Sequence, residues 1–403
     1  MKLTGIGKFI LFILAIGVAI GGWRFWQQKQ APGASGSTPG AAAPGLSTSG
    51  TTTGNGNALT GADNEILFLI TGSKKGWVQN QVARFNAAQN GKWKIVTQTA
   101  PSREGMHAIL KGDIKPVLWS PDGAMWPTRL AQVWKAQYST SLIDANDSNS
   151  RRTFLRTPLV FLTTRQKAKF LRPILGGAQP WLGLRDLSLG RKKVPWGEFK
   201  FSHADPIASN SGMMLLGLIL YDYAQREGQA GNIERLGTDA KFLNYLRELE
   251  KKMVYDGPAQ GGSSALAKAF LADPSRYDAI VAYENVALEG AAKNPELAVI
   301  YPSPTALSEQ SVTLLSGGWI TPAQREGALA FLTFLGSGES LQDGIKSHFR
   351  PAQSDGDLSL NPELARFSGQ GFQQSYSAVE LPGYKALNET AFQWRLKVAK
   401  KAG

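Results

Sequence analysis

The chain has 403 residues, of which 42% are hydrophobic, 44 are basic and 31 are acidic, so its formal net charge is +13. This length exceeds what one simple core holds, and we expect a globular body of two lobes or domains. With no cysteine and three histidines, the sequence excludes disulfides, thiolate metal sites and a cysteine nucleophile. It also argues against a histidine-rich metal site. We therefore expect neither a metal nor another cofactor.

Residues 1–27 have the features of a membrane anchor or a signal sequence. An uncharged run at 9–23 lies between two basic residues. Counted from Ile6 to Trp26, with both charges at the interface, the segment reaches the length of about 20 residues that a bilayer requires. A cleaved signal peptide is the alternative, but no small-x-small cleavage site precedes the bulky end of the run. We favour an uncleaved, single-pass anchor in the cell membrane, and either interpretation places the globular part in the periplasm or outside the cell.

Residues 28–63 are rich in Gly, Ser, Thr, Ala and Pro, lack aromatic side chains and carry almost no charge. Such a segment cannot bury enough apolar surface to fold. We expect a flexible, disordered linker that tethers the globular part, which begins at residue 64, to the anchor.

From residue 64 onward, strand patterns alternate with helix patterns. Helices are expected at 77–90, from an opening at 100–105 to about 110, and at 213–223. Short apolar strands are expected at 65–70, 93–99, 117–120, 159–164, 199–202 and 279–283. This alternation predicts an α/β fold with a mainly parallel, wound sheet. In such sheets the ligand binds outside the carboxyl ends of the strands.

Polar loops follow several of these strands, and the most informative one precedes the helix at 213–223. There Ser209, Asn210 and Ser211 stand in a row. Ser and Asn are preferred helix caps, and three candidates exceed what one cap needs. The surplus hydroxyls and amides at the positive end of a helix favour an anionic or polar ligand, although a plain cap on a buried helix is the competing interpretation. None of the loops supplies a recognisable nucleophile–base pair, which is typical of binding without catalysis.

Five stretches together resemble the bacterial extracellular solute-binding proteins of ABC-transporter type, near the molybdate- and sulfate-binding branch. They are ILFLITGSKKGW, LKGDIKPVLWSPDG, SHADPIASNSGMMLL, YDAIVAYENVAL and GWITPAQREGALAFLTFL with the later FRPA. The resemblance covers about residues 64–352. It is strongest to a subgroup often fused to a von Willebrand factor A domain, but no such domain fits in this chain.

The resemblance implies a type II periplasmic-binding-protein fold, in which crossing strands join two α/β lobes around an interlobe ligand cleft. We assign 64–160 to the first lobe, 161–304 to the second, and 305–403 to the rest of the first lobe and a C-terminal extension. The implied protein is not an enzyme. It captures a small polar or anionic solute and serves an inner-membrane permease or another membrane protein.

The residues that the resemblance places at the ligand are Ser73, Ser102, Ser209, Asn210, Ser211 and Tyr283. Ser120 and Asn285 join them, because they lie in loops at the same strand ends. Neutral hydrogen bonds and helix N-termini would hold the ligand while the lobes close over it.

Some neighbouring residues depart from a simple oxyanion site. Glu284 would repel a dianion if it faced the cleft, and a structural carboxylate paired with an arginine is the alternative. Trp119 and Trp126 flank the same loops together with Arg103, and we favour core packing over ligand stacking for both tryptophans.

Other classes of function remain as alternatives. His203, Asp205 and Ser209 or Ser211 are the residue types of a serine hydrolase, but no nucleophile elbow surrounds them. A tethered sensory or interaction module without transport is the second alternative, and the aromatic tail after residue 354 either packs on the body or docks a partner. The short basic clusters lie in no RNA- or DNA-binding motif. We expect no nucleic-acid partner, because a basic surface facing an anionic membrane explains these charges.

Overall fold

The computed structural model describes residues 64–144, 147, 150–257, 261–352 and 361–399. The predicted anchor at 1–27 and the predicted linker at 28–63 lie outside these described residues. Within the described ranges, no helix has both the length and the apolar character that a membrane span requires.

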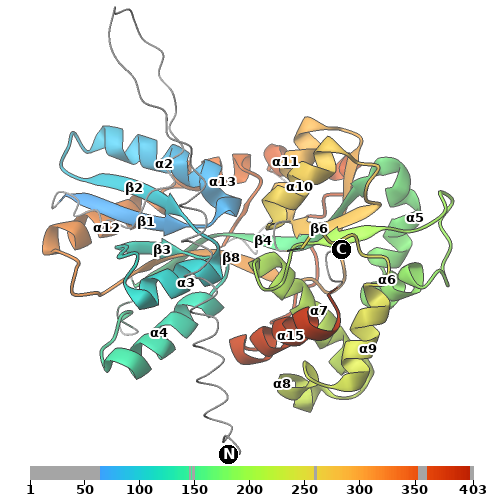
Figure 1. The fold of residues 1–403 in the computed structure, drawn as a ribbon. Coiled ribbons are helices and arrows are strands. Elements are labelled where there is room, and N and C mark those ends of the chain that lie inside the picture. The colour runs from blue at the N-terminus through green and yellow to red at the C-terminus, as the bar shows by residue number, and fades with distance from the viewer. Residues whose placement is uncertain (1–63, 145–146, 148–149, 258–260, 353–360, 400–403) are drawn as a thin grey trace, which may run out of the picture. The chain divides into compact units, whose positions relative to one another are not determined.

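The first lobe is built on a parallel three-stranded sheet. Strand β1 (Glu65–Ile70) lies between β2 (Lys94–Thr99) and β3 (Leu118–Ser120). Around these strands lie five helices, namely α2 (Lys75–Ala88), α3 (Ser102–Lys111), α4 (Met125–Tyr138), α12 (Pro322–Leu335) and α13 (Gly338–Lys346), as Figure 1 shows. Most of β1 is buried because helices cover both of its faces, and Phe68 meets Phe331 of α12 edge to face.

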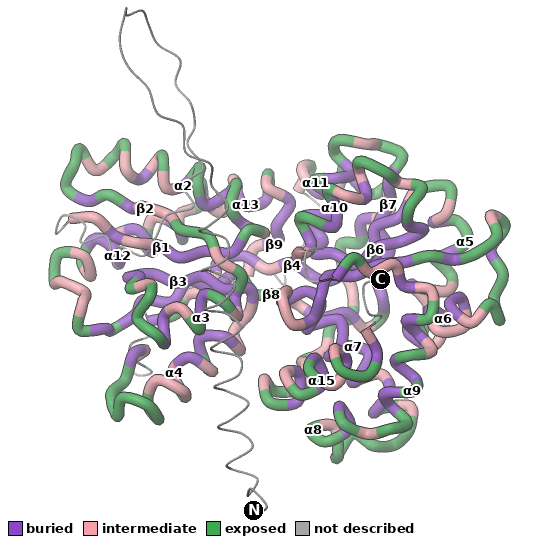
Figure 2. Tube along the Cα trace, in the orientation of Figure 1, coloured by how far each residue is buried: buried purple, intermediate pink, exposed green. Residues whose placement is uncertain are grey.

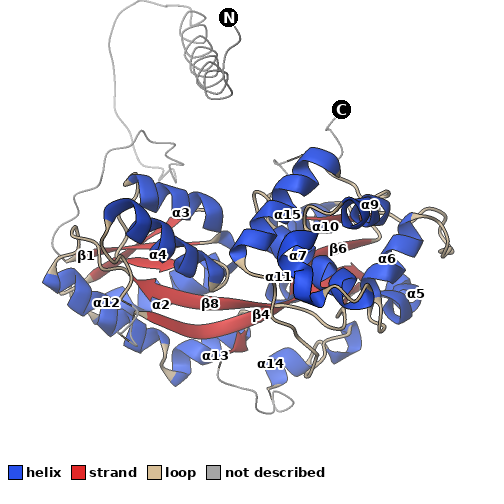
Figure 3. Cartoon of the chain, turned by 90° about the horizontal axis from the view of Figure 1, so that it is seen from below, coloured by secondary structure: helices blue, strands red, loops and turns tan. Residues whose placement is uncertain are grey.

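Two long strands cross from one lobe to the other. Strand β4 (Arg151–Thr164) pairs with β8 (Leu307–Leu314) and β9 (Arg350–Pro351) along its first half. Along its last residues it pairs with β6 (Ala279–Tyr283) and β7 (Leu297–Ile300) of the second lobe. Figure 3 shows both crossing strands running between the two groups of helices. With β5 (Phe201–His203) at one edge, the sheet order is β2-β1-β3-β8-β4-β6-β5.

The prediction of a mainly parallel sheet is wrong for this central part. Strand β4 is antiparallel to β6, β7, β8 and β9, and β3 is antiparallel to β8. The chain leaves the first lobe along β4 and returns along β8, so the two crossing strands run in opposite directions. The parallel pairs are β1–β2, β1–β3 and β5–β6.

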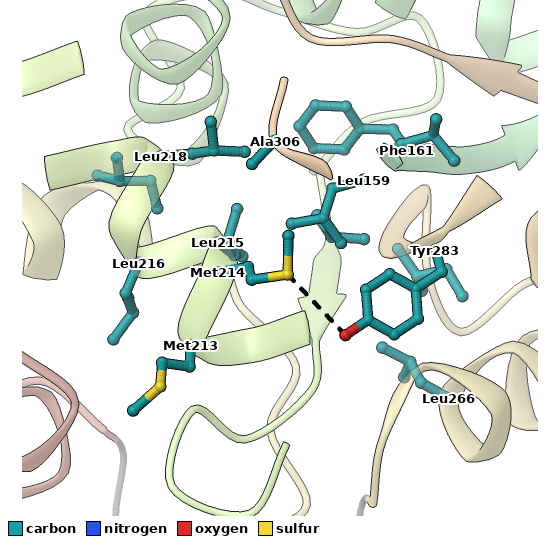
Figure 4. Packing of buried hydrophobic residues seen from close by; sticks show 14 of the residues in the cluster. Leu159, Phe161, Met213, Met214, Leu215, Leu216, Leu218, Leu266, Tyr283 and Ala306 are labelled. Carbon is teal, nitrogen blue, oxygen red and sulfur yellow. Dashed lines mark hydrogen bonds between the residues drawn. The ribbon is translucent and has the colours of Figure 1, made fainter. Parts of the chain in front are cut away.

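The second lobe surrounds a buried central helix. This helix, α7 (Asn210–Arg226), is buried on all sides over its first eleven residues, because the apolar run after residue 212 leaves it no polar face (Figure 2). The other elements are α5 (Arg165–Leu175), α6 (Pro180–Ser188), β5 (Phe201–His203), α8 (Ile233–Leu236), α9 (Ala240–Leu249), α10 (Ser263–Ala272), β6 (Ala279–Tyr283), α11 (Glu284–Lys293) and β7 (Leu297–Ile300). Figure 4 shows Met214 and Leu215 of α7 beside Leu159 of β4.

The C-terminal extension packs on the body, as one of the two interpretations of the aromatic tail predicts. It contains α14 (Pro362–Ala365) and α15 (Tyr384–Lys397). Helix α15 packs mainly on α7 and α8 of the second lobe and also contacts α4 of the first lobe. Trp394 and Leu387 of α15 are fully buried, whereas Phe392 remains 46% exposed and Leu396 75% exposed.

Candidate ligand-binding site

The hydroxyl groups predicted at the first two strand ends gather around a carboxylate, that of Asp122. Thr71 Oγ1 and Ser73 Oγ donate hydrogen bonds to Asp122 Oδ1 at 2.5 and 2.8 Å. Ser102 Oγ accepts a hydrogen bond from the backbone N–H of Asp122 at 3.0 Å. Ser73 and Ser102 therefore both bond to Asp122, and the hydroxyl of Ser73 is directed at a carboxylate of the protein itself.

A buried lysine stands behind this carboxylate. Lys74 ends the short 3-10 helix η1 (Gly72–Lys74), and its Nζ lies 3.3 Å from Asp122 Oδ1. The same Nζ donates to the carbonyl and the hydroxyl of Ser120, both at 3.0 Å, and to the carbonyl of Pro121 at 2.9 Å. Burial lowers the pKa of Lys74, and the neighbouring carboxylate partly offsets this shift.

The hydroxyl of Ser120 is used in hydrogen bonds within the protein. Besides accepting from Lys74, its hydroxyl donates to the carbonyl oxygen of Ser311 in β8 at 2.7 Å. Of the predicted hydroxyls at the strand ends of the first lobe, Ser120 is thus the one that fastens β3 to a crossing strand.

The helix start at 209–212 differs from the predicted cap. Ser209 occupies the N-cap position of α7, but its side chain accepts no capping hydrogen bond. Its hydroxyl lies 3.0 Å from the hydroxyl of Ser211 instead. A side chain at Gly212 would place Cβ 2.1 Å from the carbonyl oxygen of Ala204, so only glycine allows the helix to begin this close to the end of β5.

Asn210 connects helices α7 and α4 with the end of strand β6. Its Oδ1 accepts a hydrogen bond from Trp126 Nε1 of α4 at 2.7 Å, and its Nδ2 donates to the hydroxyl of Tyr283 at 2.8 Å. Tyr283 and Met214 point toward one another in Figure 4. Burial raises the pKa of Tyr283 well above its ordinary value, so its hydroxyl stays neutral. Trp126 is buried, as the core-packing interpretation expects, and it also joins the first lobe to the second.

Asn285 makes a second bond between the lobes. Its Nδ2, on α11, donates to the carbonyl oxygen of Ser73 at 3.2 Å, and its backbone N–H donates to Thr157 Oγ1 at 3.1 Å. Asn285 is buried, and its Oδ1 receives no hydrogen bond from the described residues.

Glu284 belongs to the structure rather than to the cleft. Arg350 Nε and Nη2 donate to its two carboxylate oxygens at 2.7 and 2.6 Å, and the hydroxyl of Tyr301 donates to it as well. Both members of the ion pair are fully buried. The interpretation of Glu284 as an arginine-paired structural carboxylate is confirmed.

The residue types of a serine hydrolase are present, but the structure does not assemble them. The ring nitrogens of His203 lie 2.9 Å from the carbonyl oxygen of Ala204 and 3.1 Å from Glu250 Oε1. Burial opposes a charge on His203, but Glu250, the carbonyl of Ala204 and Asp205 together outweigh it and raise the pKa. Asp205 in turn accepts from Tyr255 and Arg395. Both ring nitrogens thus face partners other than Ser209 and Ser211.

A cavity of about 460 Å³ lies beside these residues. Asp122 and Asn210 form part of its wall, and residues 378–382 of the C-terminal extension form another part. Arg103 makes a third connection between the lobes, because its Nε donates to the carbonyl oxygen of Ile207 at 3.0 Å. Among the described residues, no three acidic or histidine side chains are grouped closely enough to hold a metal ion.

Residues 66–348 match the family model described as bacterial extracellular solute-binding protein. The chain belongs to this family. A search of curated proteins found no match.

Solved structures of other solute-binding proteins share the fold of this family member. The sulfate-binding protein SubI of Mycobacterium tuberculosis is 14% identical, with 81% of this chain and 96% of the other covered at a TM-score of 0.54. The periplasmic binding protein AfuA of Actinobacillus pleuropneumoniae, solved with fructose-6-phosphate, is also 14% identical, covering 83% and 98% at 0.54. The ferric binding protein of Campylobacter jejuni is 12% identical, covering 82% and 98% at 0.54. The structural similarity shows that the chain has the two-lobe α/β fold of periplasmic binding proteins. At identities this low it shows the fold alone.

Sequence reasoning missed the carboxylate at which the polar loops of this candidate site meet. Asp122 follows Ser120 by two residues, in the turn after β3. The signal that points to it is the Ser-Pro-Asp-Gly turn at a strand's carboxyl end, where ligands of α/β sheets bind. Its hydroxyl partner Thr71 lies 51 residues away in the chain, so the contact itself has no local signature.

Proposed function

We propose that this solute-binding protein captures a small polar solute between its two lobes and passes it to the permease of an ABC-type transporter. The proposal includes an uncleaved membrane anchor at residues 1–27 and a flexible tether at 28–63, with the two-lobe body in the periplasm or outside the cell. Single-pass anchoring keeps the body near a membrane partner.

The observation that carries the proposal is the meeting of polar loops from both lobes beside a cavity. Asn210 lines the cavity, and Ser73 and Ser102 each bond to Asp122, which also lines it. The lobes are joined there by single hydrogen bonds, such as the one from Asn285 to Ser73. Each such bond contributes a net stability of roughly 0.5–1.5 kcal/mol. Contacts of this size allow the lobes to open and close around a solute.

The charge of the solute is not selected by the fold. The similar structures are named for sulfate, for a bound sugar phosphate and for ferric iron. In this chain the carboxylate of Asp122 accepts the hydroxyls that an oxyanion would need. Within the predicted pair of polar or anionic solutes, this arrangement favours the polar one, because two negative charges in contact repel each other.

The absence of cysteine from the sequence permits a direct test of solute binding. Lys111→Cys on α3 and Lys268→Cys on α10 replace exposed residues in the two lobes, and the pair carries the two dyes of a fluorescence energy transfer experiment. A panel of oxyanions, metals, sugars, amino acids and amines is added while the melting temperature is recorded. One class should raise the melting temperature and shorten the distance between the dyes. If no compound of the panel changes the melting temperature or the distance between the dyes, the proposal is contradicted.

A sensory or interaction role without transport is the second candidate. Two exposed apolar side chains of α15, Phe392 and Leu396, favour it, because they offer a protein partner a contact surface on the C-terminal extension. Phe392→Ser with Leu396→Ser should leave solute binding unchanged under either function. Loss of a membrane-protein partner without loss of uptake would favour the sensory role.

A further inference from the structure

The interlobe cavity has an unusual charge for so basic a protein. Its wall comes from the first lobe, from α7, from β8 and from the C-terminal extension. Three of the lining residues are acidic, and none is basic; the full set is Asp122, Gly123, Ala124, Met125, Asn210, Met214, Leu307, Glu309, Ala378, Val379, Glu380, Leu381, Pro382 and Leu387. The cavity therefore differs from the chain as a whole, whose formal net charge is +13.

Asp122 presents a free acceptor to this cavity. Asp122 is only 8% exposed. Every hydrogen bond that its carboxylate accepts from the described residues falls on Oδ1, and the contact of Lys74 falls there too. Oδ2 is left without a donor among the described residues. Oδ2 is also not among the side-chain atoms that the protein fully encloses, so a solute in the cavity can reach it and donate to it.

A second acceptor without a donor lies close by in the same network. Asn285 Oδ1 receives no hydrogen bond from the described residues, while the Nδ2 of the same side chain holds Ser73, whose hydroxyl bonds to Asp122. The network around Asp122 is therefore short of donors, and at Asp122, which lines the cavity, we expect the solute to bring one.

No cationic side chain of the described residues contacts Asp122 Oδ2. Lys74 is occupied behind the carboxylate, where its Nζ donates to Ser120 and Pro121. Glu309 and Glu380 are exposed and form no ion pair with the described residues. Arg156 lies directly opposite Glu309 in the β4–β8 register but outside the cavity wall. The recognition of charge thus rests on Asp122 more than on the rim.

The remaining wall is apolar. Met125, Met214, Leu307, Val379, Leu381 and Leu387 contribute to it. Methionine side chains adapt to ligands of different shape, and a volume near 460 Å³ suits a small organic molecule.

We propose that the cavity binds an organic cation, with an ammonium or amidinium group that donates to Asp122 Oδ2 and an apolar part between the methionine and leucine side chains. This inference rests on the proposed solute-binding function and names the class of its solute. Residues 378–382 complete the pocket, so the C-terminal extension takes part in recognition.

The test uses the full chain in mild detergent and three matched series of probes. The cations are 2-phenylethylammonium, benzamidinium and hexylammonium. The neutral counterparts are 2-phenylethanol, benzamide and 1-hexanol, and the anions are phenylacetate, benzoate and hexanoate. Titration calorimetry gives each Kd. At least one cation should bind about tenfold or more tightly than its neutral and anionic counterparts, because only the cation brings both a donor and a positive charge to the Asp122 carboxylate.

Two variants and a control locate the effect. Asp122→Asn should weaken the binding of that cation about tenfold or more. Should this variant fail to fold, Glu380→Lys at the exposed rim should still weaken it at least about threefold. Glu289→Gln, an exposed substitution on α11, should leave the Kd unchanged. Cation binding that ignores both Asp122→Asn and Glu380→Lys would overturn the inference.

The outcomes also separate this inference from the proposed function. Preference for the anions, or for an oxyanion or sugar, overturns the organic cation and leaves solute binding standing. If none of the cations, neutral molecules and anions binds, the proposal of an organic cation is overturned. The wider panel with the dye-labelled lobes then decides the proposed function.

Discussion

Replacing Arg350 by methionine should cause a large loss of stability. Arg350 is fully buried, and it donates two hydrogen bonds to Glu284 and two more, at 2.5 and 2.7 Å, to the carbonyl oxygens of Gln373 and Gln374. It thereby joins β9 to helix α11 and to the C-terminal extension. Arg350→Met keeps much of the side-chain volume but leaves the carboxylate of Glu284 buried without its cation.

The size of the loss follows from the charge left behind. Removing one partner of a buried ion pair costs about 3–5 kcal/mol. A buried carboxyl that loses its cation also has an escape, since it can take up a proton. At pH 7 this uptake costs about 3.7 kcal/mol, at 1.36 kcal/mol for each unit above the usual glutamate pKa of about 4.3, and at pH 5 only about 1 kcal/mol. We expect a destabilisation of about 3–5 kcal/mol at pH 7 and a clearly smaller one at pH 5.

Urea denaturation, followed by tryptophan fluorescence and circular dichroism, measures this loss. The matched control is Lys293→Met, which removes the cation from Glu289 on the same helix, where both side chains are more than half exposed. It should cost less than about 0.5 kcal/mol. Adding Glu284→Gln to Arg350→Met should recover part of the stability. A loss for Arg350→Met of under about 1 kcal/mol, or one that does not shrink at pH 5, would refute the reasoning.

Three further perturbations should have measurable effects. Trp394→Ala should lower the free energy of unfolding by about 3–5 kcal/mol, because it empties a fully buried site on α15, whereas Leu396→Ala on the exposed face of the same helix should cost under about 0.5 kcal/mol; equal losses in urea denaturation would contradict the packing of α15. His348 has its pKa lowered to about 4 by burial and by the nearby Arg366, so it adds stability above pH 6.5 that is lost as the pH falls toward 4. Asn tolerates the left-handed backbone at this position (φ 65°), so His348→Asn should remove about 2 kcal/mol of this loss. A stability–pH profile that His348→Asn leaves unchanged would contradict this role of His348. Gly212→Ala should prevent the start of α7 from packing on Ala204, and a melting temperature equal to that of the native protein would show the close approach to be wrong.

The sequence predicts best the elements whose own residues determine them. The strands expected at 65–70 and 279–283 coincide with β1 and β6, because each contains an apolar run of five residues that is followed by polar residues. Strand β8 was not predicted because its sequence, LSEQSVTL, carries Ser and Gln at buried positions. The first half of β4 was not predicted because three arginines, at exposed or half-buried positions, interrupt its apolar residues. Both strands are defined by their pairing with each other across the lobes.

The candidate site shows the same division. The loops that hold Ser73, Ser102 and Asn210 lie at strand ends, and the topology alone brings them together. The hydrogen-bond partner of each hydroxyl could not be predicted. The hydroxyl of Ser73 donates to Asp122, which lies 49 residues away in the chain. The closing of the cavity by residues 378–382 could not be foreseen either, because the C-terminal extension lies beyond the part of the chain that resembles the family.

Native mass spectrometry of the full chain, purified gently in mild detergent, tests most directly whether a solute occupies the interlobe cavity. Ala378→Trp fills the cavity wall from an exposed position, and Ala87→Trp adds the same bulk to an exposed position on α2 as a control. The account predicts a bound small molecule on the native protein and on Ala87→Trp, and its loss from Ala378→Trp. A bare native protein, or a small molecule that Ala378→Trp retains in full, would contradict it.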